Sequence, residues 1–476
     1  MLLDPDVCYR ALTSRDARFD GRFFVGVAST GIYCRPICPA RTPLRRNCEF
    51  FPAAAAAAEA GFRPCRRCRP EASPTSAAWQ GSSAMVGRAL RLLEAGALDG
   101  GSVEELAARV GSGERHLRRL FAEHVGASPL AVAQTRRVHF AKQLLDETAL
   151  PITTIAHASG FASVRRFNAA MHAAWGAAPR ELRKKPSSRS AAVVLRLAAR
   201  APFSFGDVLA YLAARAIPGV EEVGDGLYRR SVAFGKTSGV IEVAGTDGAR
   251  QVELRVPVEL APHAGPIVAR VRRVFDLAAD PASIAEPLRR DPALARRLSA
   301  RPGLRIPGAW DGFELAVRAI LGQQVTVAGA TTLAGRLAER FGRPLARPLG
   351  RVTRLSPSAA DLAARPLGAI GVPRARAGAL AALANACANG DLDLDGSLAP
   401  ELALERLEAL PGIGPWTAQY IALRALGVPD AFPASDLGLR RALGRPGRPL
   451  STAALAQRAE RWRPWRGYAA MLLWTG

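Results

Sequence analysis

The stretch Phe24–Pro39 reads FVGVASTGIYCRPICP, and Ala60–Pro70 reads AGFRPCRRCRP. Each stretch carries two cysteines at close spacing, so the chain offers two pairs of thiolates on separate turns. Tetrahedral zinc takes four such soft ligands, with each sulfur about 2.3 Å from the metal. The sequence therefore predicts one zinc ion in a small domain at the start of the chain. Its expected ligands are Cys34, Cys38, Cys65 and Cys68.

The distribution of the other cysteines favours a metal site over a disulfide framework. The chain has seven cysteines, of which Cys387 lies far from the rest. An odd count with no export signal is typical of a cytosolic metal site. Cys8 and Cys48 lack a partner at ligand spacing, and we expect them in the core or as free thiols. Spacing alone leaves open a zinc ion that only staples a small domain.

The residues around the four cysteines indicate a reactive site. The segment closely resembles the N-terminal domain of the Ada family, which repairs methyl phosphotriesters in DNA by moving the methyl group to one of its own zinc-bound cysteines. The resemblance implies that the acceptor is the first of the four, Cys34. Residues beside the ligands can hold the DNA backbone, although each alone could be a solvated surface group. These residues are Thr30, Arg35, Arg41 and Arg63.

The charge of such a centre suggests a switch. Zinc keeps a bound thiol ionised at neutral pH. Four thiolates on one Zn²⁺ carry a net charge of about −2, and methylation of Cys34 removes one negative charge. Repulsion of DNA phosphate then falls, so we expect DNA affinity to rise after methyl transfer.

Composition points to a nucleic-acid partner. The 476 residues carry a formal net charge of +24 and a pI near 11.1. An arginine-rich composition from a GC-rich genome could raise the basic count, but would not also remove acids. We expect double-stranded DNA as the partner. No apolar run spans a bilayer and no signal peptide begins the chain, so we expect a bacterial cytoplasmic protein associated with the nucleoid.

Residues 84–185 carry a helical pattern. Ser102 and Glu105 have the spacing of a capping box that opens a helix. Two helix-turn-helix units follow, joined by a helix over Leu130–Thr148, and their second helices are expected to enter the major groove. The pattern resembles the AraC-type DNA-binding domain, although an ordinary helical bundle with a basic face is the alternative. The base-reading candidates are Arg115, Arg118, Arg165, Arg166 and Asn168.

The chain divides into four predicted domains. They cover 1–77 (zinc methyl acceptor), 84–185 (double helix-turn-helix), 190–305 (mixed α+β) and 306–476 (helical). Pro-rich and Ser-rich segments at 70–83 and 184–190 are the predicted linkers. The fold class is therefore multi-domain α+β, with a small zinc domain, an all-α domain, a mixed α+β domain and a second all-α domain. Strands in the mixed domain are expected over Val193–Ala199, Tyr228–Phe234, Gly239–Val243 and Gln251–Val256.

A tight hairpin marks the last domain. Leu410–Ala418 reads LPGIGPWTA, and Gly412 and Gly414 allow backbone N–H groups to bind a DNA phosphate at a helix N-terminus. Asp436 follows 20 residues after Trp416. The pattern resembles helix-hairpin-helix glycosylases, and more narrowly the AlkA family of 3-methyladenine DNA glycosylase II. That resemblance spans the second half of the chain, including an AlkA-type N-terminal segment over 192–305.

The resemblance assigns a base pocket. Trp416 and Tyr420 lie one helical turn apart and can attract a cationic alkylated base by cation–π interaction. Asp436 is expected to stabilise the oxocarbenium-like sugar and to position water, while its alternative role is a helix N-cap. Leu437 replaces a tyrosine of the family in the pocket wall. In the family, a leucine side chain, the wedge, fills the gap that the flipped base leaves in the duplex. The corresponding position here is Gln323 or Gln324.

Three features that are missing from the sequence narrow the class of enzyme that the resemblance implies. Lyase-type relatives carry a lysine where Trp416 stands, so the resemblance implies a monofunctional glycosylase. The second half has only Cys387, so it lacks the four cysteines of iron–sulfur relatives. No Pro-Cys-His-Arg motif occurs, so the second methyltransferase of Ada is missing.

The expected function is alkylation repair and its regulation. The enzyme would be a DNA-3-methyladenine glycosylase II, an N-glycosyl hydrolase, with a single-turnover methyltransferase domain and a methylation-switched activator. The alternatives are a regulator with a catalytically weak glycosylase half and a non-catalytic zinc-stapled DNA-binding protein. The expected partners are alkylated double-stranded DNA, promoter DNA and RNA polymerase, with the chain a monomer. Beyond zinc, only a monovalent ion at the hairpin is anticipated.

Overall fold

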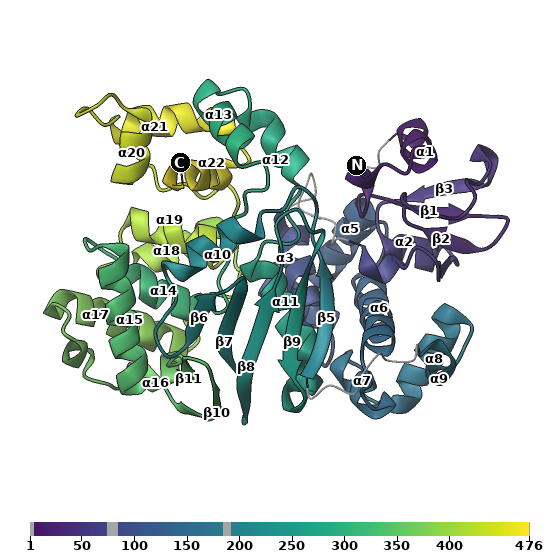
Figure 1. Cartoon of the computed structure of the whole chain (residues 1–476), viewed down its shortest axis with the longest axis horizontal. Helices are drawn as coiled ribbons and strands as arrows, with labels where there is room; N and C mark the ends of the chain where they lie inside the picture. The colour runs from purple at the N-terminus through teal and green to yellow at the C-terminus, as the bar shows by residue number, and fades with distance from the viewer. Residues whose placement is uncertain (1–3, 74–83, 184–191, 476) are drawn as a thin grey trace. The chain divides into compact units, whose positions relative to one another are not determined.

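The structure is a computed structural model that describes residues 4–73, 84–183 and 192–475 (Figure 1). The second predicted linker, and the first from residue 74 on, lie outside the described residues. The chain forms two compact units. One comprises Met1–Ala198 with Glu253–Ala269, and the other comprises Ala199–Val252 with Arg270–Gly476.

The zinc-domain segment folds around a four-stranded sheet of order β3-β1-β2-β4. The central strands β1 and β2 are antiparallel, and β4 runs parallel to β2. The sequence did not predict this sheet, because its strands have two to four residues and are too short for a period-two pattern. The elements are α1 (Pro5–Thr13), β1 (Phe24–Val27), β2 (Ile32–Cys34), β3 (Cys48–Phe51), α2 (Ala54–Glu59) and β4 (Arg63–Pro64).

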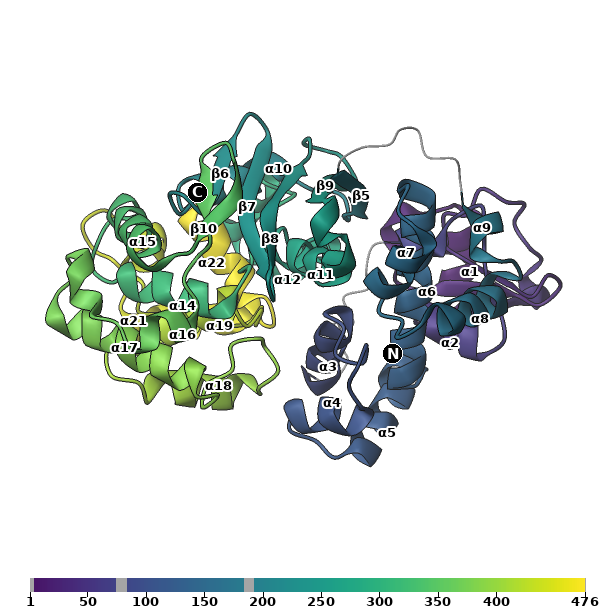
Figure 2. The same cartoon turned by 90° about the horizontal axis from the view of Figure 1, so that it is seen from below.

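The next segment is all helical, as predicted. The Ser102–Glu105 capping box is present, and Gly111 and Gly160 end helices with φ of +74° and +86°. Figure 2 shows α3, α4 and α5 at one end of the long helix α6, and α7 at the other. The helices are α3 (Ala84–Glu94), α4 (Val103–Arg109), α5 (Glu114–Val125), α6 (Pro129–Glu147), α7 (Ile152–Ala158), α8 (Val164–Trp175) and α9 (Pro179–Leu182).

The mixed α+β segment contains a five-stranded sheet of order β5-β9-β8-β7-β6. All four predicted strands are present, and β7 pairs with β8 along eight residues. In the second unit, the Phe205 ring of α10 stacks on Phe275 at 5.5 Å. The elements are β5 (Ala192–Ala198), α10 (Phe205–Ala213), β6 (Glu221–Gly224), β7 (Leu227–Phe234), β8 (Thr237–Ala244), β9 (Gln251–Pro257) and α11 (Ala264–Val274).

The remainder is helical apart from one hairpin, which the sequence analysis missed. Strands β10 (Pro344–Leu349) and β11 (Val352–Arg354) pack Leu345 and Val352 against Val240 of β8. The helices are α12 (Pro281–Leu288), α13 (Pro292–Ala300), α14 (Gly312–Leu321), α15 (Val327–Phe341), α16 (Ala359–Ala363), α17 (Arg374–Ala388), α18 (Pro400–Glu408), α19 (Pro415–Arg424), α20 (Leu437–Leu443), α21 (Thr452–Ala459) and α22 (Arg466–Trp474).

In the described ranges, no helix is long and apolar enough to cross a bilayer.

Candidate functional site

The four predicted zinc ligands come together at the ends of two neighbouring parallel strands of the first domain. Cys34 ends β2, Cys38 follows it in a turn, and Cys65 and Cys68 follow β4. Their sulfurs all lie within 4.8 Å of one another, and those of Cys38 and Cys65 are 4.0 Å apart. Four sulfurs around one zinc ion at 2.3 Å would be about 3.8 Å apart. The donor set and its spacing therefore fit Zn²⁺.

The four sulfurs are not equivalent. The Cys68 sulfur accepts a hydrogen bond from the Arg35 backbone N–H at 3.3 Å. Such a hydrogen bond draws charge from a thiolate and makes it a weaker nucleophile. The choice of Cys34 as the methyl acceptor stays a prediction.

The remaining cysteines are poor nucleophiles. Burial, with a contribution from Asp4, raises the pKa of Cys8 to about 11. Burial also raises the pKa of Cys48, and it raises that of Cys387 to about 12. All three stay protonated at neutral pH, which separates them from the cluster.

Arg35 turns inward rather than toward solvent. Its guanidinium pairs with Asp20, where Nε lies 2.8 Å from Oδ1, and Nη1 donates to the Cys68 carbonyl at 3.0 Å. The side chain is 11% exposed. In this structure it positions the second cysteine pair, and its contact with a DNA backbone stays a prediction. Thr30, Arg41 and Arg63 are exposed, as a DNA contact requires.

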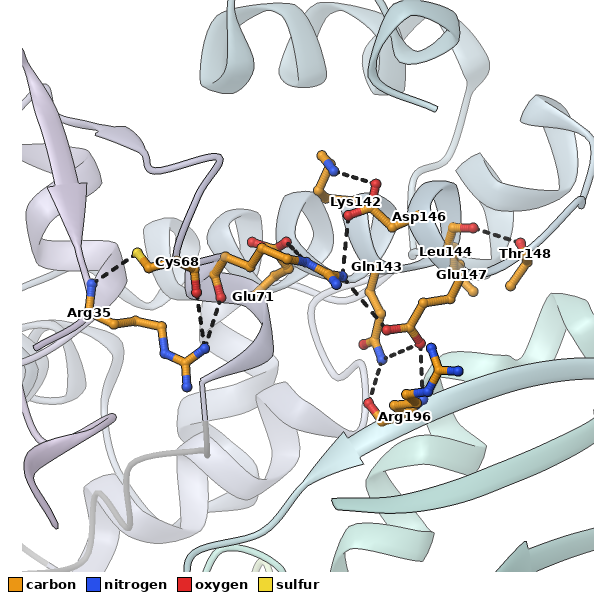
Figure 3. Close-up of polar contacts among 11 residues, drawn as sticks. Arg35, Cys68, Glu71, Lys142, Gln143, Leu144, Asp146, Glu147, Thr148 and Arg196 are labelled. Atoms are coloured by element: carbon orange, nitrogen blue, oxygen red, sulfur yellow. Dashed lines mark hydrogen bonds and ion pairs between the residues drawn. The ribbon is translucent and has the colours of Figure 1, made fainter. Parts of the chain in front are cut away.

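A buried polar network leads from the zinc cluster to helix α6 (Figure 3). Arg69, next to Cys68, pairs with Glu71 at 3.1 Å and with Asp146 of α6 at 3.2 Å. Glu147 of α6 accepts from the Arg196 amide of β5 at 2.9 Å. Tyr33, beside Cys34, also shares a 2.7 Å hydrogen bond with His139 of α6. Sequence reasoning missed these links, because their partners are far apart in the chain and carry no motif.

The predicted reading residues lie on the second helix of each helix-turn-helix unit. Arg115 and Arg118 belong to α5, and Arg165, Arg166 and Asn168 belong to α8. All five side chains are exposed. Arg118 is paired with Glu114 of the same helix at 2.5 Å, so a phosphate or base would have to compete with that carboxylate.

The hairpin before α19 has the predicted tight form. Gly412 has φ of +82°, and a Cβ there would lie 2.7 Å from the Cβ of Ala379. Gly414 is the N-cap residue of α19, and a Cβ there would meet nothing within 4 Å. The first glycine is needed for backbone shape and close packing, whereas the second leaves the helix N-terminus open.

The two wedge candidates have different surroundings. The Gln323 amide donates to the Gly412 carbonyl at 2.8 Å and to Thr417 at 3.0 Å, so it ties α14 to the hairpin. Gln324 is exposed and has φ of +55°. A non-glycine residue in that left-handed region is held at some cost and is often functional. Of the pair, Gln324 has the side chain free to enter DNA.

Asp436 lies at the centre of the base-pocket candidates. Its Oδ2 accepts from the Trp416 indole at 2.8 Å, and its Oδ1 accepts from the Trp474 indole at 3.1 Å. Oδ1 also accepts from the Leu439 amide at 2.9 Å, so Asp436 is the N-cap of α20 as well. Asp436 is therefore the N-cap that the local pattern offered, and its catalytic role stays a prediction. Trp474, near the end of the chain, was not predicted.

The Trp416 and Tyr420 rings stack directly on each other and leave no space for a base between them. The Trp416 and Tyr420 rings are 5.4 Å apart and within 8° of parallel. A base between two rings needs about twice the usual ring–ring spacing, so it must lie on an outer face of this stack. Trp474 meets Tyr420 edge to face at 6.1 Å. Leu437 is 44% exposed, so Trp474 supplies the aromatic surface that Leu437 does not.

A cavity of about 260 Å³ lies beside Trp474 in the second unit, although Asp436, Trp416 and Tyr420 are not among the residues that line it. It is bounded by helix α10, the segment before α14 and the end of α22. Tyr211, Arg215, Arg305 and Trp474 are among the residues that line it. Its volume is of the right order for a flipped base.

Comparisons with known proteins agree with this division of sites. A model of the metal binding domain of Ada matches residues 7–71, a helix-turn-helix domain matches 106–185, and the AlkA N-terminal domain matches 194–311. DNA-3-methyladenine glycosylase 2 of Escherichia coli is 38% identical over 276 residues, which cover 57% of this chain and 94% of that protein. The solved 3-methyladenine DNA-glycosylase from Archaeoglobus fulgidus, at 21% identity, covers 59% of this chain and 96% of its own with a TM-score of 0.52, and it shows the fold alone.

One relative matches along the whole chain. A probable bifunctional transcriptional activator/DNA repair enzyme AlkA of Mycobacterium tuberculosis is 45% identical over 479 residues, covering 99% of this chain and 96% of the relative. The chain therefore belongs to the family of bifunctional AlkA proteins, in which an Ada-type zinc domain and an AraC-type helix-turn-helix domain precede an AlkA-type glycosylase.

Proposed function

We propose that the chain removes 3-methyladenine and other alkylated bases from DNA, and that it also takes methyl groups from DNA phosphotriesters and activates transcription in response. The observation that carries the excision activity is the convergence of two indole N–H groups on the Asp436 carboxylate. Three donors fix the direction of this carboxylate before substrate arrives, and such preorganisation is what stabilises a developing charge.

Excision needs few protein groups. The C1′–N bond breaks, its electron pair leaves with the base, and Asp436 faces the cationic sugar. Water then adds its oxygen to C1′ and gives its proton to the Asp436 carboxylate. Trp416 occupies the place of a lyase lysine, so no covalent enzyme–sugar bond forms and an abasic site is the product.

Methyl transfer uses the N-terminal cluster once per molecule. Zinc held by the four cysteines supplies ionised thiolates at neutral pH. The Cys34 sulfur attacks the methyl carbon, an S–C bond forms, and the C–O bond breaks with its electron pair left on the phosphodiester oxygen. The choice of Cys34 over the other three ligands rests on its place as the first cysteine of the Ada-type segment.

The basic second helices of the two helix-turn-helix units suit promoter DNA. We propose that methylation of Cys34 raises affinity for that promoter, that the chain acts as a monomer, and that it recruits RNA polymerase. The buried contacts of Tyr33 and Arg69 with α6 support this coupling, because they tie the zinc domain to the helix between the two reading units.

One incubation tests both reactions. Full-length chain is mixed with methylated duplex DNA, and released bases and the mass of the Cys34 peptide are followed together. We expect 3-methyladenine release by the wild type and by Cys34→Ser, and a gain of one methyl group on Cys34 in the wild type and in Asp436→Asn. An Asp436→Asn chain with full base release would overturn the excision mechanism. Methyl appearing on Cys38 would overturn the choice of acceptor.

A further inference from the structure

A tight turn with two exposed arginines follows the helix that Asp436 caps. Beyond the end of α20, Arg445 and Arg448 form an antiparallel bridge. The Arg445 amide donates to the Arg448 carbonyl at 3.1 Å, and the Arg448 amide donates back to the Arg445 carbonyl at 2.9 Å. We call residues 444–449 the arginine turn.

The backbone of the arginine turn is fixed to the end of α20. The Leu450 amide donates to the Arg440 carbonyl at 3.0 Å, and the Arg440 side chain donates from Nε to the Leu450 carbonyl at 2.6 Å. A Cβ on Gly444 would lie 2.5 Å from the Arg448 carbonyl oxygen, so the chain passes too closely for a side chain there. Gly447, at the corner of the turn, has φ of +71°. The two arginines are therefore carried on a backbone of defined shape.

The two arginine side chains share one face of the turn and have no acid beside them. Residues directly opposite each other in an antiparallel pair have their Cβ atoms about 5 Å apart on the same face, where like charges repel. Both Arg445 and Arg448 are exposed, and neither forms an ion pair with any described residue. Residues 437–450 (LGLRRALGRPGRPL) contain four arginines and no aspartate or glutamate. An anion bound between the two guanidinium groups would relieve this repulsion.

A backbone phosphate of DNA is the anion that fits this pair. Each guanidinium group can bind phosphate oxygens in bidentate fashion, and such contacts hold the backbone without reading its sequence. The place of the turn also suits DNA. Leu437, of the predicted base-pocket wall, and Arg441 are both exposed and lie one helical turn apart on α20. One exposed face of this helix therefore leads from the pocket toward the arginine turn.

The length of α20 sets how far the turn lies from the flipped base. Its seven residues span about 10 Å, with Asp436 at one end and the arginine turn at the other. A duplex advances about 3.4 Å along its axis for each nucleotide of a strand. The arginine turn therefore lies about three nucleotides from the base in the pocket. The hairpin before α19 is closer, since Trp416 in the first turn of α19 donates to Asp436 at 2.8 Å.

We propose that the arginine turn binds one phosphate of the duplex about three nucleotides from the flipped base. The DNA is then held at two points, by backbone N–H groups at the hairpin before α19 and by Arg445 and Arg448 at the turn. Holding the backbone at two points helps to keep the flipped nucleotide out of the stack, where it would otherwise return. This inference rests on the proposed excision activity and adds to it a site for the DNA backbone.

Base release from methylated duplex DNA by the full-length chain gives the first test. Arg445→Gln combined with Arg448→Gln should raise KM about tenfold and leave kcat unchanged, because the turn binds DNA but does not touch the reacting atoms. The loss of one phosphate contact should also lower the slope of log kcat/KM against log salt concentration by about one. Lysine at both positions should restore the salt dependence but only part of the affinity, since lysine cannot bind phosphate in bidentate fashion.

The matched control removes the same charge elsewhere in the second unit. Arg343 precedes β10 and Arg351 lies between β10 and β11, and both are exposed. Figure 1 shows this hairpin and α20 at opposite ends of the second unit. Arg343→Gln combined with Arg351→Gln should therefore keep the wild-type KM and the wild-type salt dependence.

A scan of single phosphates locates the contact. Uncharged methylphosphonate replaces one phosphate at a time, on both strands of a duplex that carries a stable abasic-site analogue, and Kd is measured for the full-length chain. In the wild type, the replacement about three nucleotides from the abasic site should weaken binding about tenfold. In the variant with glutamine at Arg445 and Arg448, the same replacement should have no effect, whereas replacements next to the abasic site should weaken binding in both proteins.

Two results would count against the arginine turn as a phosphate site. One is a phosphate at that distance whose replacement weakens the wild type and the glutamine variant of the turn equally. The other is an equal KM for that variant and for the control variant of the β10–β11 hairpin. Failure of the wild type to release any base would instead overturn the proposed excision activity, because binding to the abasic-site analogue needs no bond cleavage.

Discussion

Trp474 is expected to hold Asp436 in its productive direction, because its indole N–H donates to Oδ1. Trp474→Phe removes that donor, while Trp416 and the Leu439 amide remain. A hydrogen bond to a charged group contributes about 1.5 kcal/mol, so we expect kcat for base release to fall about tenfold with little change in KM. Steady-state release of 3-methyladenine measures it.

The matched control is Trp175→Phe in the first unit. The Trp175 indole nitrogen is buried and has no hydrogen-bond partner within the described ranges, so its loss removes no donor. Base release should stay at the wild-type rate. A Trp474→Phe chain that also kept the wild-type kcat would show that Trp416 and the N-cap amide are sufficient.

At the scale of single residues, the sequence predicted the residues that belong to motifs but not the residues that contact them. Trp416, Tyr420 and Asp436 follow from the hairpin pattern. Trp474 and Tyr211 lie 38 residues after Asp436 and 209 before Tyr420 respectively, and only the fold brings them in. Arg35 was expected at DNA but pairs with Asp20, because burial beside the zinc cluster demands a counter-charge for a guanidinium.

The hairpin before α19 depends on its first glycine. Gly412→Ala adds a Cβ at 2.7 Å from Ala379 in a left-handed conformation, which costs roughly 1–3 kcal/mol. We expect faster hydrogen exchange of the amides in α18 and α19 and weaker binding of duplex DNA of any sequence. Gly368→Ala is the control, since a Cβ there meets nothing within 4 Å. Unchanged exchange in Gly412→Ala would mean that the hairpin tolerates the side chain.

Elements were predictable where a period could be read. The helices of residues 84–183 and the four long strands of the mixed sheet were expected within a few residues of their bounds. The zinc-domain strands were not, because two to four residues carry no alternation. The β10–β11 hairpin was missed because PLARPL mixes two prolines with an arginine and shows no alternating face.

At the scale of the whole molecule, we expect zinc to stabilise the fold of the first unit and to have no effect on the second unit. Metal binding supplies folding free energy to a site of four thiolates, which repel one another without it. Chelation should therefore unfold the first domain. It should also loosen the last turns of α6, because Arg69, the neighbour of Cys68, pairs with Asp146 and Glu147. Hydrogen exchange would show faster exchange there, while release of 3-methyladenine stays unchanged and added zinc restores the protection.

The Arg69→Met variant separates the effect of losing zinc from the effect of losing the Arg69 ion pairs. It keeps the four ligands and the Lys142–Asp146 pair but removes the cation on the zinc side of the network. Zinc should therefore stay bound while the last turns of α6 lose protection and promoter affinity becomes less sensitive to methylation of Cys34. Loss of base release in parallel with zinc would contradict the independence of the second unit. Full protection of α6 in Arg69→Met would instead mean that Tyr33 and His139 carry the coupling, since their hydrogen bond also joins a neighbour of a zinc ligand to this helix.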